Sequence, residues 1–265
     1  MKIDFRAIFA VYLPPLATVA LLIAVWAMAV ETLGLPSHLL PTPGAVGARL
    51  MEGMFTNGDM LPHIFRTLWT AAAGLALGSA AALIVAVALD EFSLLDRMFY
   101  PAIAAIQSIP KVSLAPLVLI WAGFNVGSTI ILVALISFYP VFVATYGGLK
   151  SVDPNLIALC RVHRASRLFT LVHVKAPTAA SHMLAGLQVA VAFALVGCVV
   201  MEFITGTGGA GFLIDNSANS LDTATAVAAM AVLGLIGAAG SLGFRLLRDT
   251  AVFWDGPAGS PGAGE

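Results

Sequence analysis

Long apolar runs, separated by short polar segments, make up most of the chain. A helix that crosses a bilayer needs about 20 apolar residues in succession. Six stretches qualify, so the sequence predicts an all-α integral membrane protein with one transmembrane domain over residues 1–248. We expect the six spans at residues 10–30, 67–89, 101–121, 128–149, 179–204 and 223–246.

Composition agrees with this pattern. Of the 265 residues, 60% are hydrophobic and 10% are charged, whereas soluble domains carry about 25% charged residues. A membrane bundle explains these values and a soluble enzyme does not. The net charge of −1 provides no field for nucleic acid, so no nucleic-acid partner is expected. Cys160 and Cys198 lie in different environments, which predicts two free thiols.

The two ends of the chain need separate interpretation. Lys2 and Arg6 precede an apolar run over residues 7–30. A secretory signal has an apolar core of about 7–15 residues, so we interpret this longer run as an uncleaved span, with a cleaved signal as the alternative. Residues 249–265 are predicted to be a disordered tail, because Gly, Pro, Ser and Ala dominate its end.

The distribution of basic residues predicts the orientation. Cytoplasmic segments of membrane proteins carry an excess of Lys and Arg. With the N-terminus inside, the outer segments hold Arg49 and Arg66 only, so both termini are predicted to be cytoplasmic. The inner segments hold Lys2, Arg6, Arg97, Lys150, Arg161, Arg164, Arg167, Lys175, Arg245 and Arg248.

Residues 150–177 form the longest basic segment between spans. Asp153 is a good N-cap and Pro154 suits the first helical position, so a short helix is expected there. Ser166 is expected to cap a second short helix. Two capped helices favour docking of a soluble partner. The alternative is a basic segment held at anionic lipid, where each charge contributes about 1 kcal/mol.

No motif in the chain indicates catalysis. Residues 206–211 read GTGGAG, but G-x-G-x-x-G binds dinucleotides only between a strand and a helix. No P-loop is present, because Leu149 stands where the motif needs glycine before Lys150. The five histidines lack metal-site spacing, so we expect no metal and no cofactor on this chain. If ATP is used, another polypeptide must bind it.

Charged residues inside spans are the better functional signal, since they are costly there and often face a cavity. Lys111 follows Pro110, which cannot donate a backbone hydrogen bond and should loosen the helix near Gln107. Gln107, Lys111 and Glu202 are candidate residues of a substrate pathway. The alternatives are that Lys111 snorkels or pairs within the bundle and that Glu202 is simply interfacial.

Several motifs in a specific order resemble a known family. They are LPTPGAV (40–46), IPKVSLAPLVLIWAGF (109–124), FYPVFVATYGGLKSVDP (138–154), GLQVA (186–190) and MEF (201–203). Together they are similar to the permease subunit of bacterial ABC importers of the binding-protein-dependent type, in the nitrate/sulfonate/taurine branch. The resemblance runs from about residue 40 to residue 213.

The family's cytoplasmic signature is E-A-A, three residues, Gly, nine residues, I-x-L-P. Aligned on Pro177, it places E-A-A on residues 158–160 and the glycine on Arg164. An arginine in the left-handed conformation costs roughly 1–2 kcal/mol, or else the turn is remodelled. The ATPase-coupling residues that the resemblance implies are Asp153, Pro154, Ala158, Leu159, Cys160, Arg161, Arg164, Ala165, Ser166, Arg167 and Pro177.

The resemblance also implies a mechanism and partners. Two permease subunits, identical or different, form the pathway in the bacterial inner membrane. Cytoplasmic ATPase subunits, which bind ATP and Mg, grip the loop at 150–177, and a periplasmic binding protein delivers substrate. Expected substrates are nitrate, a sulfonate, taurine or a thiamine-precursor pyrimidine. The alternative function is a secondary transporter or channel that works without an ATPase.

Overall fold

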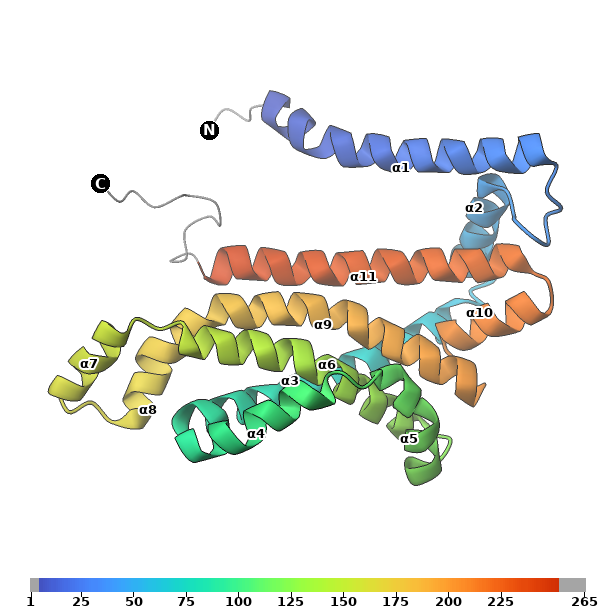
Figure 1. The fold of residues 1–265 in the computed structure, drawn as a ribbon. Helices are drawn as coiled ribbons and strands as arrows, with labels where there is room; N and C mark the ends of the chain where they lie inside the picture. The colour runs from blue at the N-terminus through green and yellow to red at the C-terminus, as the bar shows by residue number, and fades with distance from the viewer. Residues whose placement is uncertain (1–4, 253–265) are drawn as a thin grey trace. The chain divides into compact units, whose positions relative to one another are not determined.

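All regular elements in the described part of the protein, residues 5–252 of a computed structural model, are helical. Most of the tail predicted at 249–265 lies outside these residues. Figure 1 shows the path of the chain. The helices are α1 (Phe5–Leu33), α2 (Pro43–Met51), α3 (Leu61–Glu91), α4 (Ser93–Ile106), α5 (Ala115–Ala122), α6 (Val126–Lys150), α7 (Pro154–Val162), α8 (Arg167–Thr170), α9 (Ala176–Thr205), α10 (Ala210–Asn219) and α11 (Thr223–Ala251), with π turns η1 (Glu52–Thr56) and η3 (Leu171–Lys175) and a 3-10 turn η2 (Lys111–Leu114).

The membrane character of the protein is confirmed by helix length and composition. Four helical stretches among the described residues are long and apolar enough to cross a bilayer: α3, α6, residues 167–205 and α11. A fifth crossing follows if α4 and η2–α5 together count as one span. The apolar helix described within α1, Ala17–Leu33, is shorter.

The third expected span, at 101–121, is not one continuous helix. Helix α4 ends at Ile106, and the chain becomes helical again at Lys111 with its direction changed by 89°. Pro110 directly precedes the new helix and has an extended backbone. Because proline has no N–H, it cannot continue the helical hydrogen bonds, so the break lies where the sequence predicted loosening.

The helices fall into two compact units, which are described separately. One comprises the chain as far as His63 with Leu213–Val232, and the other comprises Ile64–Phe212 with the chain from Leu233.

In the first unit, α2 follows the LPTP segment as a short capped helix. The Thr42 hydroxyl accepts a hydrogen bond from Ala45 N at 3.2 Å. Near the end of α2, Arg49 forms an ion pair with Asp59 at 2.6 Å and a hydrogen bond with Thr225 at 2.7 Å. The hydrogen bond from Arg49 is the main cause that holds the pKa of Asp59 below its ordinary value.

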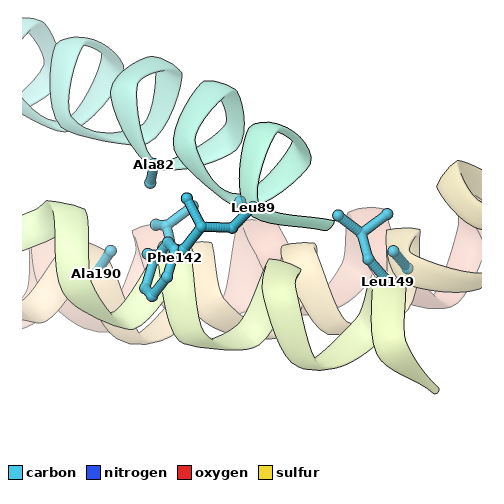
Figure 2. Close-up of a cluster of buried hydrophobic side chains, with 8 residues drawn as sticks. Ala82, Leu89, Phe142, Leu149 and Ala190 are labelled. Carbon is cyan, nitrogen blue, oxygen red and sulfur yellow. The ribbon is translucent and has the colours of Figure 1, made fainter. Parts of the chain in front are cut away.

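In the second unit, small residues bring α3, α6 and α9 together. A Cβ on Gly74 of α3 would lie 2.5 Å from Val133 Cβ of α6, and one on Gly186 of α9 would lie 2.6 Å from Ala144 Cβ. Such contacts are how helices approach closely in lipid. Figure 2 shows the apolar cluster that results, in which Leu89 of α3 lies near the fully buried Phe142 of α6.

Candidate functional site

A cavity of about 660 Å³ lies within the second unit, at the break between α4 and η2. Gln107 and Lys111 line it, together with Pro110 between them. The structure therefore brings two of the three predicted pathway residues to one cavity. The other walls come from α6 and α9 and are mainly apolar: Ile136, Tyr139, Pro140, Val143, Ala144, Ala185, Gly186, Val189, Phe193 and Val196.

Lys111 is the cation of this cavity. Its ammonium nitrogen lies 5.0 Å from the centre of the Tyr139 ring, within the range of a cation–π contact. Among the cavity-lining residues there is no carboxylate. The cavity thus offers one positive charge, the Gln107 amide and apolar walls, which suits a small ligand with a negative group.

Glu202, the third candidate, lies elsewhere. Its side chain is 3% exposed, near the end of α9. The Thr67 hydroxyl donates to the carboxylate at 2.7 and 2.9 Å, and Gly211 N donates at 2.8 Å. Because α10 begins at Ala210, the carboxylate satisfies a free N–H in the first turn of that helix. Through these hydrogen bonds, Glu202 links the end of α9 and the start of α10 to α3.

The GTGGAG segment is held rather than loose. Arg66 donates to the Thr207 carbonyl and, at 3.0 Å, to the Thr207 hydroxyl. A Cβ on Gly211 would lie 2.9 Å from Glu202 Cβ, so that position needs glycine. The segment lies against α3, with Gly208 next to Arg66 and with Gly209 and Gly211 next to Glu202.

The basic segment at 150–177 forms a helix, a turn and a second short helix, as the caps predicted. Asp153 accepts from Asn155 N at 2.8 Å at the start of α7, and Ser166 accepts from Phe169 N at 3.1 Å at the start of α8. Beyond α8 the helix widens into the π turn η3 before α9 begins. We call residues 150–177 the coupling loop from here on, after the role that the resemblance implies for this segment.

Arg164 has a positive φ of 51° at the end of α7. Arg164 N donates to Arg161 O at 3.0 Å, and Ala165 N donates to Cys160 O at 2.9 Å. These two bonds define a Schellman motif, whose left-handed position is usually glycine. Of the two possibilities that the sequence left open, the turn is therefore kept and Arg164 adopts the strained conformation.

The tip of the coupling loop is exposed. Leu159, Val162 and Leu168 present large apolar side chains to the exterior. Arg161, Arg164 and Arg167 are exposed around them and have no side-chain hydrogen bond or ion pair within residues 5–252. The base of the loop differs, because Lys150 and Lys175 are bound to carboxylates at the ends of α3 and α4.

Residues 74–250 match the family described as "Binding-protein-dependent transport system inner membrane component". This chain belongs to that family. The predicted function, a permease subunit of an ABC importer, is confirmed, and the alternative of a transporter that works without an ATPase is set aside.

Named relatives support the assignment. The chain is 34% identical over 204 residues to a probable ABC transporter permease protein of Haemophilus influenzae, covering 76% of this chain and 81% of that one. It is 32% identical over 206 residues to the riboflavin transport system permease RibX of Chloroflexus aurantiacus, with 78% and 76% covered. It is 30% identical over 246 residues to the taurine transport permease TauC of Escherichia coli, with 91% and 89% covered.

Solved structures show the same fold. An inward-facing structure of the MetNI methionine ABC transporter matches with a TM-score of 0.60 at 17% identity, covering 71% of this chain and 95% of that one. An amino acid ABC transporter structure also gives 0.60 at 16% identity, with 77% and 98% covered.

Sequence reasoning missed the partners of the candidate residues. Thr67 and Arg66 begin an apolar run and gave no separate signal. Asp90 directly follows the span predicted at 67–89 and was given no role, although it binds two lysines from the coupling loop. The sequence did contain one usable signal. Acidic residues cluster at the end of one predicted span, and a basic segment follows another, so the two could be expected to pair.

Proposed function

We propose that this permease carries a small anion, such as nitrate, a sulfonate or taurine, or else a thiamine-precursor pyrimidine, and that a separate ATPase drives it through the coupling loop. The observation that carries the proposal is the tip of that loop, where capped helices present apolar side chains among unpaired arginines. A soluble partner with an acidic rim and an apolar groove fits this surface. Lipid headgroups would not require two capped helices.

The full architecture follows from the same proposal. Helix α1 and the bent pair α4–α5 complete six spans with α3, α6, α9 and α11, and both termini lie in the cytoplasm. A second permease subunit completes the pathway. A periplasmic binding protein delivers substrate, and ATP with Mg is bound by the ATPase subunits.

The cavity at the α4 break supports an anionic substrate. Lys111 supplies its positive charge and Gln107 a hydrogen-bonding amide. Relatives are named for transport of riboflavin, aliphatic sulfonates, formylaminopyrimidine and taurine. Butanesulfonate, taurine, formylaminopyrimidine and riboflavin therefore form a suitable uptake panel, with nitrate as a fifth compound.

The docking proposal is tested by co-purification of the ATPase with the permease. Deletion of residues 153–173 should abolish association, and serine at Arg161, Arg164 and Arg167 together should weaken it about tenfold or more, because each arginine loses a charge-assisted contact. The matched control replaces Arg245 and Arg248 of α11 with serine. Stable association after the deletion would contradict the proposal.

The pathway proposal is tested with Lys111→Met in proteoliposomes that contain the permease, ATPase and binding protein. A lost contact to a charged group is worth about 1.5–3 kcal/mol, so uptake of an anionic panel compound should fall about tenfold or more, while assembly is unchanged. The Lys111→Arg variant should retain part of the uptake. Arg245→Met, which removes an exposed charge, should retain all of the uptake. Unchanged uptake in Lys111→Met would remove Lys111 from the pathway.

A further inference from the structure

Both ends of the coupling loop are bound to the same carboxylate. Asp90 lies in the last turn of α3. Its Oδ1 is 3.4 Å from the Nζ of Lys150, the last residue of α6, where the loop begins. Its Oδ2 is 2.6 Å from the Nζ of Lys175, the last residue before α9. One side chain of a membrane helix therefore closes the base of the loop.

Asp90 is the buried centre of a shared cluster whose outer members are partly exposed. The Asp90 side chain is 5% exposed. Lys175 also binds Glu91 at 2.7 Å, and Lys150 also approaches Asp96 at 3.4 Å. The Tyr146 hydroxyl donates to Asp96 at 2.7 Å. The cluster thus links the ends of α3 and α6 and the starts of α4 and α9 into one polar network.

Stability alone does not explain such a network. Ion pairs withdrawn from water often contribute no more to stability than apolar packing would, because desolvation offsets their attraction. They do fix the relative position of the elements they join, since an unpaired buried charge is strongly unfavourable. Asp90 would lose one partner if either end of the loop moved away from α3, and would be left unpaired if both did.

We propose that Asp90 is the positioning residue that converts movement of the coupling loop into movement of α3. The inference rests on the proposed function, in which an ATPase grips the tip of the loop. When the tip is displaced, Lys150 and Lys175 move together because both bind Asp90. Helix α3 must follow, and α3 packs on α6 and α9, which line the cavity. In this arrangement, the ion-paired base of the loop transmits the movement to α3, and the exposed tip of the loop binds the ATPase.

The test measures movement directly and needs no known substrate. Val112 lines the cavity and is 43% exposed, so Val112→Cys reports access to it. Cys160→Ala removes the partly exposed thiol, and Cys198 is fully buried. In the complete permease–ATPase complex, the rate of labelling by a water-soluble maleimide is measured before and after trapping with ATP and vanadate.

Asp90→Asn should uncouple movement at the tip of the coupling loop from access to the cavity. We expect ATP trapping to change the labelling rate about fivefold or more in the parent complex and less than about twofold in the variant, within the range by which network residues alter coupling. ATPase association and basal ATP hydrolysis should stay within about twofold. Uptake of the best-imported panel compound should fall about tenfold. Asp90→Glu should restore part of the response.

The controls separate transmission from assembly. Asp249→Asn removes a carboxylate from an exposed pair with Arg248 and should change neither readout. Lys150→Met and Lys175→Met should each reduce the ATP-dependent change, and Asp90→Asn combined with Lys175→Met should add little, because the residues act in one network.

A full ATP-dependent change in Asp90→Asn would overturn the inference. So would loss of assembly in Asp90→Asn if both lysine variants retained full coupling, because Asp90 would then act only on stability. Neither outcome touches the proposed function. That function fails separately, if the ATPase still binds after deletion of residues 153–173.

Discussion

Arg164→Gly should stabilise α7 of the coupling loop relative to Arg164→Ala, which removes the same charged side chain. Arg164 occupies the left-handed position of the Schellman motif with φ at 51°, and its side chain is exposed. The two hydrogen bonds of the motif come from the backbone of Arg164 and Ala165, so they survive the substitution. Only the conformational preference at residue 164 and one positive charge change.

The magnitude follows from two opposing effects. A residue with a Cβ loses roughly 1–2 kcal/mol in the left-handed region, which glycine does not. Glycine has more conformational freedom than other residues when α7 is locally unfolded, and the loss of this freedom on folding costs about 0.5–1 kcal/mol. Relative to alanine, which keeps the Cβ and also lacks the charge, glycine at this position therefore gains about 0.5–1 kcal/mol, equivalent to roughly a two- to fivefold smaller population of the locally unfolded state of α7.

Hydrogen exchange of the α7 amides, followed by mass spectrometry on the permease in nanodiscs, measures this opening. Compared with Arg164→Ala, Arg164→Gly should slow exchange of these amides roughly two- to fivefold. Arg164→Ala keeps the Cβ and removes the charge, so it reports the charge effect, about 0.3–1 kcal/mol in the opposite direction because a cation near a helix C-terminus is favourable.

Arg161→Gly is the matched control, because it removes the same charge within α7. There glycine should speed exchange about fivefold, since glycine is about 0.8–1 kcal/mol less favourable than good helix formers. Faster exchange in Arg161→Gly than in the native protein, together with slower exchange in Arg164→Gly than in Arg164→Ala, would support the backbone explanation. Faster exchange in Arg164→Gly than in Arg164→Ala would refute it.

Three further predictions concern other parts of the protein. Glu202→Ala should lower the free energy of unfolding by about 2–4 kcal/mol in detergent, because the Thr67 hydroxyl and a backbone N–H lose their acceptor. Glu202→Gln should be less affected, and equal melting temperatures for Glu202→Ala and the native protein would contradict this prediction. Gly78→Leu should cost about 1–3 kcal/mol by thermal unfolding, because a Cβ there would clash with the backbone of α6, and the same change at an open glycine of α11 serves as control. Because Arg49 lowers the pKa of Asp59, their pair is fully stabilising above the unfolded Asp pKa of about 4 and is lost as pH falls through the lower folded value. Asp59→Asn should therefore cost less than about 1 kcal/mol at neutral pH, because the pair is partly exposed, and progressively less as the pH falls below the unfolded value. A difference in unfolding free energy that stays constant with falling pH would count against the pair.

The sequence predicted best what depends on neighbours in the chain. Asp153 and Ser166 were expected to cap helices, and both accept the backbone N–H bonds of caps. Such bonds form within a few residues, so residue type and spacing predict them. Pro110 likewise predicted where a helix would loosen, since its effect on the backbone is local. The 89° change of direction could not be predicted, because packing decides it.

Contacts between distant residues were not predictable. Glu202 reads as an acid at the end of a span, and nothing nearby indicates that Thr67 will bind it. Asp90, Lys150 and Lys175 are separated by whole helices, and their pairing depends on how α3, α6 and α9 pack. A pattern of apolar residues predicts that these helices pack together but not which polar ends meet.

The conformation of Arg164 and the position of Asp90 bear on the same mechanical requirement. A flexible loop between two spans would absorb displacement at its tip, because many backbone conformations connect the same ends. The coupling loop avoids this in two places. At the tip, the Schellman motif closes α7 even though Arg164 is strained there. At the base, Asp90 holds both ends. A strained turn and a buried charge each lower stability, and the proposed transmission of movement through this loop accounts for the retention of both.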